Sequence, residues 1–455
     1  MPLAWLPMVV QLAWAGGQCS AFPSPYEVVL PASQPNDIVL AGGFGLFVSS
    51  DDGVTWWYQC LGVQQCPRSG YAYGADGTLF ADLLGYPDGG PETVPAISTD
   101  LACGWTASAG LSSSDVWAAA FDPTAEGHLL VLSSLDGGSG TSAAFPSVDD
   151  GATFGRPVYA THDSLSSLAY CASEPGSLYL AGNGWTDGGA TGVPFLVQGL
   201  DGGATWSPEL EHPELAQALG SLLGDAGPGA DGASNPRISL VAVDPADCGT
   251  VYLRLTTPAG EGLAVSHDRG ATLQLVFTLQ GGASISGVAV GADGTTFVAT
   301  GCSPARDCPD HGLWAASPGN SSFQRVSPID ATCLGVRGDR LYACGDDGTD
   351  GFALGVSTDD GKTFMPVVRF SGIDGIATCP GSPLGEACEQ AWCGPAGLAE
   401  ALGVDAGCGL DAGPAAAPSV SPPPKGCGCG TGDSAGWLSL LLGIPLAPRT
   451  RRRNS

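Results

Sequence analysis

Basic residues are scarce in this chain of 455 residues. It has 16 Lys and Arg against 45 Asp and Glu, which gives a net charge of −29, and its only lysines are Lys362 and Lys425. Nucleic acid binding requires clustered basic side chains that neutralise phosphates. The composition therefore excludes a nucleic acid partner and favours a soluble protein that attracts cations or a neutral or basic partner.

The usual motifs of metal binding and catalysis are missing as well. The five histidines show no metal-ligand spacing, and no C-x-x-C pair has a partner pair. There is neither a nucleotide-binding loop nor a G-x-S-x-G motif. We therefore expect no metal and no cofactor.

Glycine and proline, in contrast, are abundant. The 70 Gly and 36 Pro, together with only 13% charged residues, indicate many short strands joined by tight turns. The hydrophobic fraction of 44% is sufficient for a sizeable core. Apolar residues do not recur with the 3.6-residue period of helices, which argues against a helical solenoid.

One short pattern recurs seven times. It reads S-S-D-D-G-V-T-W at 49–56, S-V-D-D-G-A-T-F at 147–154, S-H-D-R-G-A-T-L at 266–273 and S-T-D-D-G-K-T-F at 357–364. A copy at 199–206 keeps only D-G-G-A-T-W, and those at 98–105 and 316–323 are more degenerate. The copies start 41 to 67 residues apart, which indicates a repeat architecture.

The pattern is typical of a turn between two strands. The Asp carboxylate accepts backbone N–H bonds within the turn, and the Gly adopts a positive φ. The hydroxyls close the turn, and the last aromatic side chain is buried beneath it. We expect a structural role for these residues: Ser49, Asp51, Gly53, Thr55, Trp56, Ser147, Asp149, Gly151, Thr153, Asp201, Gly203, Thr205, Trp206, Ser266, Asp268, Gly270, Thr272, Ser357, Asp359, Gly361, Thr363 and Phe364.

These repeats resemble the Asp-box, or BNR repeat, of sialidase-like β-propellers, and the resemblance covers residues 26 to about 370. Four short strands can be assigned to each repeat, for example 115–123, 128–135, 142–146 and 154–160. The predicted fold is therefore all-β, a seven-bladed β-propeller of four-stranded antiparallel blades. A small Cys-rich, partly helical C-terminal cap is expected on the last blade, with short helices within 386–402.

The domain organisation follows from composition. We predict a signal peptide at 1–21, the propeller at 22–370, the Cys-rich cap at 371–410, a Pro/Ala-rich linker at 411–426 and a C-terminal sorting signal at 427–455. An insertion at 208–236 includes a candidate short helix at 210–223.

Sixteen cysteines indicate an oxidising compartment outside the cytoplasm. Short spacing predicts the disulfides Cys60–Cys66, Cys302–Cys308 and Cys333–Cys344. Without Cys19, Cys427 and Cys429 thirteen cysteines remain, an odd number, and Cys103 is our choice for one left unpaired or bridging to another chain.

The C-terminus has three parts: Cys427 and Cys429, an apolar run at 437–447, and the arginines 449 and 451–453. This order resembles the MYXO-CTERM sorting signal of bacterial surface proteins. The resemblance implies export, removal of the tail, and attachment to the cell surface or outer membrane through one of the two cysteines. The apolar run is shorter than the roughly 20 residues of a membrane-spanning helix. We expect membrane contact only through this anchor, and a monomer.

The predicted function is a binding or scaffold module for a glycan or a surface protein. Loops on the face opposite the repeated turns carry the candidate ligand-binding residues Tyr86, Trp185, Asp187, Arg306, His311, Asp346 and Asp350. No catalytic residue is assigned, because fold alone does not define activity.

Two other functions stay open. The first is a glycoside hydrolase of the sialidase-like superfamily. The resemblance implies three arginines, a Tyr–Glu pair and an acidic residue for a sialidase, and no such set can be placed in the sequence. Asp-box xyloglucanases are also similar, but they form their cleft between two propellers. The second is an assembly factor, because the chain also resembles the propeller-type photosystem assembly factors.

Overall fold

The computed structural model describes residues 25–404, except for 44, 60–69, 86–91, 112–114, 136–139, 186–190, 216–217, 219–235, 258–259, 281–282, 303–309, 378–384 and 395–396. Two compact units are distinguished, 1–410 and 411–455, and the second lies outside the described residues. The predictions for the signal peptide, linker and sorting signal, with Cys427 and Cys429, therefore fall outside the structure.

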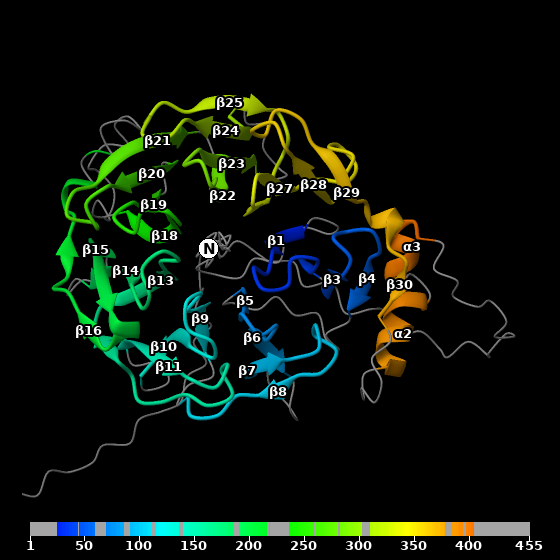
Figure 1. Ribbon diagram of the computed structural model, residues 1–455, viewed down its shortest axis with the longest axis horizontal. Helices are drawn as coiled ribbons and strands as arrows, with labels where there is room; N and C mark the ends of the chain where they lie inside the picture. Colours follow the sequence, from blue (N-terminus) through cyan, green and yellow to red (C-terminus); the bar gives the residue numbers. More distant parts are fainter. Residues whose placement is uncertain are drawn as a thin grey trace, which may run out of the picture. The chain divides into compact units, whose positions relative to one another are not determined.

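Seven antiparallel sheets are arranged in a ring around a central axis (Figure 1). Blades 1 to 4 contain β1 (Pro25–Val29), β2 (Ile38–Gly42), β3 (Gly45–Ser49) and β4 (Trp57–Gln59); β5 (Tyr71–Tyr73), β6 (Leu79–Gly85), β7 (Glu92–Ser98) and β8 (Thr106–Ala107); β9 (Val116–Phe121), β10 (Leu129–Ser134), β11 (Ser142–Ser147) and β12 (Tyr159–Thr161); and β13 (Ser164–Tyr170), β14 (Leu178–Trp185), β15 (Thr191–Leu200) and β16 (Thr205–Trp206).

Blades 5 to 7 follow the same order. They contain β18 (Arg237–Val243), β19 (Val251–Thr257), β20 (Gly260–Ser266) and β21 (Gln274–Gln280); β22 (Ala283–Val290), β23 (Thr296–Cys302), β24 (Gly312–Ala316) and β25 (Gln324–Ser327); and β26 (Cys333–Arg337), β27 (Arg340–Cys344), β28 (Leu354–Ser357) and β29 (Met365–Val368). The predicted seven-bladed propeller is confirmed.

Two details differ from the sequence prediction. The last strand of blade 3 begins only at Tyr159, and the residues before it bond to β11 irregularly, through the N–H groups of Gly155 and Val158. The segment predicted as a helix at 210–223 begins with a short strand, β17 (Leu210–Glu211), which pairs with β15, and helical residues follow at Glu214, Leu215 and Ala218. In this ladder Leu210 lies opposite Leu196 and Glu211 opposite Phe195.

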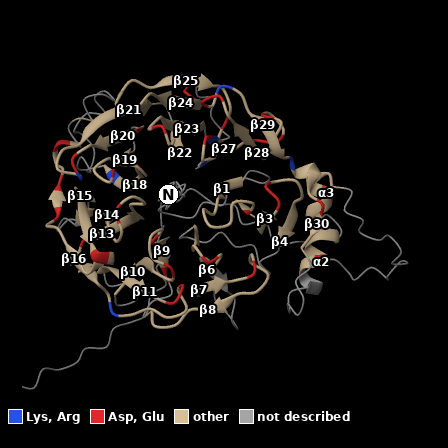
Figure 2. Cartoon of the chain, viewed as in Figure 1, with Lys and Arg blue, Asp and Glu red and all other residues tan. Residues whose placement is uncertain are grey.

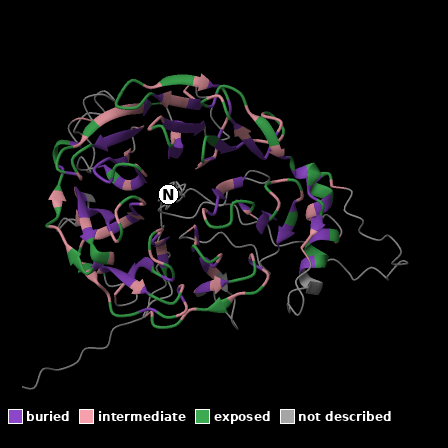
Figure 3. Cartoon of the chain, in the orientation of Figure 1, coloured by how far each residue is buried: buried purple, intermediate pink, exposed green. Residues whose placement is uncertain are grey.

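The second strand of each blade is apolar on both sides because each blade is packed between two others. All five residues of β2 are buried, and so are the first five of β10. Such strands have a nearly continuous run of apolar residues instead of a two-residue alternation. In Figure 3 the buried segments lie toward the inside of the ring, and the exposed ones toward its rim.

The core is correspondingly divided. Seven hydrophobic clusters of described residues occur, one at each boundary between consecutive blades. Each combines side chains of two blades, as where Phe80 of blade 2 packs near Phe154 of blade 3, with ring centroids 5.9 Å apart. Each of these clusters of described residues is shared by two blades, so that neighbouring blades stabilise one another.

Because the strands alternate in direction, the propeller has two different faces. We call the one with the turns between first and second and between third and fourth strands the turn face. The opposite one, with the loops between second and third strands and between blades, is the loop face. The seven repeated turns all join a third to a fourth strand, which places them on the turn face.

Polar side chains link the blades near the loop face. The first strand of each blade, next to the axis, is its inner strand (Figure 1). At five boundaries, a backbone N–H near the start of an inner strand donates a hydrogen bond to a side chain of the preceding blade: Tyr71 to Glu27 (3.1 Å), Val116 to Asp82 (3.2 Å), Leu165 to Ser142 (3.2 Å), Ile238 to Asn183 (3.0 Å) and Ile285 to Glu261 (2.7 Å). At the other two, Ser286 donates to the carbonyl of Ala331, and Thr332 to that of Pro25 (2.6 Å).

The ring is closed by residues that follow the last blade. β30 (Gly375–Ile376) pairs in parallel with β4 and becomes a fifth strand of blade 1. The predicted helices follow as α2 (Gly385–Cys393) and α3 (Leu398–Leu402). Trp392 of α2 stacks on Tyr58 of β4, with ring centroids 5.0 Å apart. The sequence places this cap on the last blade, whereas its core includes residues of both blade 7 and blade 1.

Candidate functional site

The repeated turn is organised around one carboxylate. In blade 3, Asp149 accepts hydrogen bonds from the Ser147 hydroxyl (2.7 Å) and from the N–H (2.8 Å) and hydroxyl (2.6 Å) of Thr153. The turns of Asp51, Asp268 and Asp359 repeat these contacts.

The same hydrogen bonds keep these carboxylates ionised. Bonds from the following threonine, backbone or hydroxyl, hold the pKa of Asp51 and Asp268 below the usual range and lower that of Asp359 to about 2. An acid that donates a proton in catalysis needs the opposite shift. This arrangement stabilises the turn and leaves no oxygen prepared for proton transfer.

The degenerate copies differ in an unexpected way. Asp100 keeps the network, with bonds from Ser98 (2.8 Å) and the N–H of Gly104 (2.8 Å). Asp201 has lost it within the described part of the chain and has a positive φ of 53° itself. The reason is that Gly199 replaces the serine which anchors the other copies.

Each repeated turn also contacts the preceding blade. The glycine, which five of the seven copies keep, has a φ of +77° to +88°, and a Cβ there would lie 2.3 Å from Leu196 in the case of Gly270 and 2.4 Å from Leu313 in the case of Gly361. Just before the glycine stands a residue with φ near 60°, such as Asp52, Arg269 or Asp360. We call it the fourth turn position.

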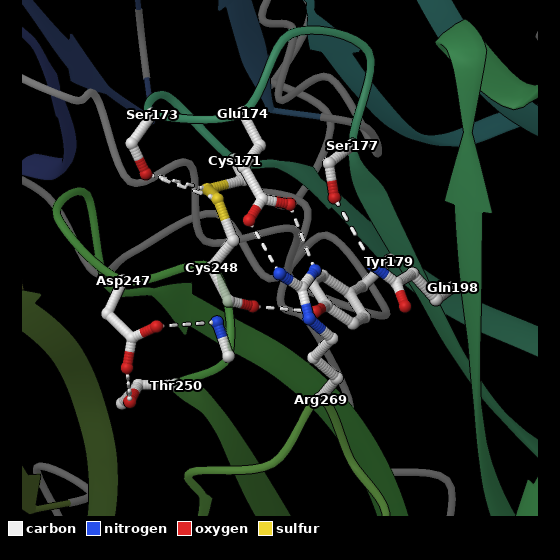
Figure 4. Close-up of polar contacts among 11 residues, drawn as sticks. Cys171, Ser173, Glu174, Ser177, Tyr179, Gln198, Asp247, Cys248, Thr250 and Arg269 are labelled. Carbon is white, nitrogen blue, oxygen red and sulfur yellow. Dashed lines mark hydrogen bonds and ion pairs between the residues drawn. A yellow bond between two sulfur atoms is a disulfide. The ribbon is translucent and has the colours of Figure 1, made fainter.

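Figure 4 shows the boundary between blades 4 and 5 on the turn face. Arg269, at the fourth turn position of blade 5, binds both oxygens of Glu174 (2.9 and 2.5 Å) in the inner hairpin turn of blade 4. Beside this pair, a disulfide joins Cys171 to Cys248. Tyr179 donates a hydrogen bond to the carbonyl of Cys248 (2.6 Å).

The boundary between blades 7 and 1 has the same contact with the charges exchanged. Asp52, at the fourth turn position of blade 1, pairs with Arg340 (2.9 Å) and Arg337 (3.5 Å) of blade 7. Arg337 also donates to the carbonyl oxygens of Pro35 (2.6 Å) and Asp37. Between blades 4 and 5 one basic side chain meets one acidic side chain, and between blades 7 and 1 two basic side chains meet one acidic side chain.

The boundary between blades 6 and 7 has a cleft at the equivalent place, between the fourth turn position and the inner hairpin turn of the preceding blade. It has a volume of about 230 Å³. Its lining includes the carboxylates of Asp293, Asp339 and Asp360, which come from three different turns. The buried side chains of Phe297 and Leu341, which are 5% and 4% exposed, also contribute. This cleft is our candidate functional site.

The surroundings of the cleft are acidic. Acidic segments occur around the whole ring, whereas basic ones are few (Figure 2). Arg340 lies at the edge of the cleft, but its guanidinium is bound to Asp52 of blade 1. Lys362 is the one lysine within the propeller and reaches Asp360 at 3.3 Å, with both side chains more than half exposed. An exposed pair of this kind contributes little, about 0–1 kcal/mol.

Most ligand-binding residues expected from the sequence lie outside the described residues: Tyr86, Asp187, Arg306 and the side chain of Trp185. The other three lie together on the loop face near blade 7. Asp350 accepts the N–H of Asp346 (3.0 Å), and the charge of His311 acts on it. Burial raises the pKa of Asp350. Asp346 itself accepts the N–H groups of Gly348 (2.8 Å) and Thr349 (2.9 Å).

A further carboxyl group, Glu27, was not expected from the sequence. It lies in the inner strand of blade 1, half-buried beside the next inner strand, and accepts the N–H of Tyr71. Burial raises its pKa to about 8, although the Tyr71 hydrogen bond lowers it. No motif marks this residue in the sequence, because its environment comes from two blades.

The cysteines are partly as expected. Cys333 and Cys344 form the predicted disulfide. Cys60, Cys66, the side chain of Cys302 and Cys308 lie outside the description. The prediction that Cys103 is unpaired is wrong, because it is disulfide-bonded, as are Cys388 and Cys393. Cys103 lies at the boundary with blade 1, where its sulfur is 3.9 Å from the side chain of Gln59. The residues next to Cys103 in the sequence therefore did not reveal which residues lie near it in the fold.

Among the described residues, no group of three or more His, Cys, Asp or Glu side chains is arranged to hold a metal ion. No described helix is long and apolar enough to cross a membrane.

The fold defines the chain as a seven-bladed β-propeller. No family model and no curated protein sequence matches it. Among solved structures, similarity extends to an ancestral GH74 enzyme, with 12% identity over 76% of this chain and 49% of that one and a TM-score of 0.39. A Niastella koreensis GH74 enzyme has 15% identity, coverages of 75% and 71% and a TM-score of 0.27.

A puromycin-hydrolyzing peptidase of Mycobacterium tuberculosis has 13% identity over 78% of this chain and 54% of that one, with a TM-score of 0.48. The chain spans about half the length of the ancestral GH74 enzyme. At such identities the similarity is one of fold.

Proposed function

We propose that this protein is an exported propeller, held at the cell surface through its C-terminal cysteines, that binds a glycan or a surface protein. The resemblance of its repeats to Asp-boxes and of its tail to the MYXO-CTERM signal supports this proposal. The observation that carries it is the cleft between blades 6 and 7, in which carboxylates surround a partly apolar hollow. Polar groups around an apolar wall are typical of binding sites.

The test is a binding screen with the purified, full exported chain. It is applied to a glycan array and, in parallel, to immobilised surface proteins of the producing cell, at 0.15 M salt to screen non-specific attraction to the acidic surface. Saturable binding to one class supports the proposal and names the class. Absence of saturable binding to both overturns it.

A glycoside hydrolase is the second candidate, and Glu27 is the observation that favours it. Glycosidases use a carboxylic acid of raised pKa to protonate the leaving group, and the pKa of Glu27 is raised to about 8. The chain is assayed on a panel of chromogenic glycosides. Hydrolysis that is lost in Glu27→Gln supports this function, whereas hydrolysis unchanged in Glu27→Gln, or none by the wild type, contradicts it.

A further inference from the structure

We infer that the cleft between blades 6 and 7 takes a basic side chain, lysine or arginine, from a protein partner. This inference rests on the proposed binding function and narrows its partner to a protein. It uses two independent observations: the chemistry of the cleft, and the contacts found at the same place between other blades.

The cleft combines an apolar wall with an anionic rim. Phe297 and Leu341 are almost completely buried and form part of its wall, whereas Asp293, Asp339 and Asp360 are exposed. Lysine and arginine have the matching structure, because an apolar stem carries a charged end. The volume of about 230 Å³ is below the roughly 300–1,000 Å³ of sites for drug-sized ligands, which suits a single side chain.

The other blade boundaries show what occupies this place. Between blades 4 and 5, the fourth turn position carries Arg269, and its guanidinium binds Glu174 of the preceding hairpin turn. Between blades 7 and 1, Arg340 of the preceding hairpin turn binds Asp52 at the fourth turn position. The propeller thus contains two examples of a guanidinium bound at this place.

Between blades 6 and 7, both corresponding turns present acids. The fourth turn position is Asp360, and the preceding hairpin turn carries Asp293. Asp293 is held in place by the N–H (2.9 Å) and hydroxyl (2.8 Å) of Thr295, neither of which brings a positive charge. Both side chains line the same cleft, and like charges repel each other. Asp360 pairs with Lys362 of its own turn (3.3 Å), an exposed pair that a partner can displace, and a basic side chain from a partner would add the pairing across two blades that the other two boundaries have within the chain.

The probes are two short peptides, Ac-Gly-Gly-Lys-Gly-Gly-NH2 and its arginine counterpart, titrated against the full chain at 0.15 M salt. The acetyl-lysine peptide, which has the same length without the charge, is the control ligand. We expect saturable binding of the charged peptides and at least tenfold weaker binding of the acetylated one. Equal binding of charged and acetylated peptides, or none by the wild type, overturns the inference.

Two variants test the position of the site. Asp360→Arg copies the residue that blade 5 has at this turn position, where φ is 61° for Arg269 and 59° for Asp360. We expect it to fold, to pair with Asp293 and to weaken peptide binding at least tenfold. Asp150→Arg is the matched control, since it makes the same change of charge at the same turn position in blade 3, and Asp150 does not line the cleft.

Peptide binding that is unchanged in Asp360→Arg, or equally weakened in Asp150→Arg, assigns the effect to the overall negative charge and overturns the inference. Spermidine in place of the peptide distinguishes a free polyamine: if spermidine binds and neither peptide does, the protein partner is wrong. The glycan and surface-protein screen is repeated with Asp360→Arg. If the wild-type ligand still binds, the proposed function stands and the inference about the cleft fails.

Discussion

Arg269 and Glu174 form a bidentate ion pair across the boundary between blades 4 and 5. The fourth turn position has a left-handed backbone conformation in Asp52, Asp150, Arg269 and Asp360. In Asp52 and Arg269, this conformation accompanies a side chain that bonds to the preceding blade. The repeated turn is therefore a joint between blades as well as a connection within one.

The disulfide beside this pair should contribute more to stability than the pair itself. Both ion-pair side chains are more than 40% exposed, so that their contribution is about 0–1 kcal/mol. Cys171 and Cys248 are 77 residues apart, and a cross-link of that span stabilises by about 4 kcal/mol in the chain-entropy account. We expect the variant with both cysteines changed to Ala to unfold at clearly lower urea concentration.

The local disulfide provides the comparison. Cys333 and Cys344 are 11 residues apart, for which the same account gives about 3 kcal/mol. If its removal destabilises more than that of Cys171–Cys248, loop entropy does not dominate. Non-reducing peptide mapping of the same samples tests the pairs Cys60–Cys66 and Cys302–Cys308, and free thiols at those positions contradict them.

Replacement of a turn carboxylate should destabilise the fold without affecting binding. Asp149→Ala removes the acceptor for Ser147 and Thr153. We expect a loss of about 1–3 kcal/mol in the free energy of unfolding. Asp339→Ala, at an exposed carboxylate outside these turns, should change it by no more than about 0.5 kcal/mol. Loss of binding in Asp149→Ala with an unchanged melting temperature would show a ligand role instead.

Contact with the preceding blade should make the turn glycines sensitive to substitution. In Gly270→Ala, the new methyl group lies 2.3 Å from Leu196 at a φ of +87°. We expect roughly 1–2 kcal/mol from the backbone and about 1–3 kcal/mol from the steric overlap. Gly319 has a φ of +67° with no atom within 4 Å, so that Gly319→Ala isolates the backbone cost. Equal melting temperatures of the two variants would mean that the overlap relaxes freely.

The propeller should lose stability in acid in a defined window. The pKa of Asp359 falls from 3.8 to about 2 in the folded protein. A pKa lowered by folding gives stability that is present above the unfolded value and is lost as pH falls through the folded one. We therefore expect urea midpoints to fall between about pH 4 and 2. Asp359→Asn should show a shallower fall there, and an identical pH profile would contradict the assignment.

Surface attachment should depend on the C-terminal cysteines. The tail after Cys429 is expected to be removed and the chain attached through Cys427 or Cys429, with one or more lipid chains. Mature protein should then lack Arg449, Arg451, Arg452 and Arg453 by intact mass. Replacing both cysteines with Ser should release the propeller or leave a precursor. Detection of Arg453 in surface-extracted wild type contradicts the processing, and an anchored double variant contradicts the role of the cysteines.

The fold was predictable because its signal is local and repeated. Seven copies of a turn pattern fix the number of blades, and each copy is readable within eight residues. How well a copy keeps the sequence pattern does not predict, however, how well it keeps the hydrogen bonds of the turn. Asp100 keeps its hydrogen bonds although its copy is degenerate, whereas Asp201 loses them in a copy that keeps D-G-G-A-T-W. The serine at the first position decides, since it anchors the carboxylate.

The candidate site was not predictable in the same way. The cleft combines turns of two blades, and Asp293 and Asp360 are 67 residues apart. Within the repeat, Asp360 is an ordinary acid, and Asp150 likewise faces an acid of the preceding blade, Asp76; what distinguishes Asp360 is the cleft that it lines. The sequence did contain one indication: the arginine of S-H-D-R-G-A-T-L shows that the residue at the fourth turn position differs in charge between blades. The neighbour of each position becomes known only from the assembled ring.

The closing strand has a consequence for how the chain folds. Trp56 in blade 1 binds Asp374, 318 residues further along the chain. A chain that crosses a membrane N-terminus first presents blade 1 long before its closing partner arrives. Until then, the outer edge of β4 offers unpaired backbone groups to any other strand, a known route to aggregation. Under the proposed export, blade 1 is the first blade to leave the membrane and the last to be completed. Its exposed edge would therefore depend most on the rate of secretion and on protection by chaperones.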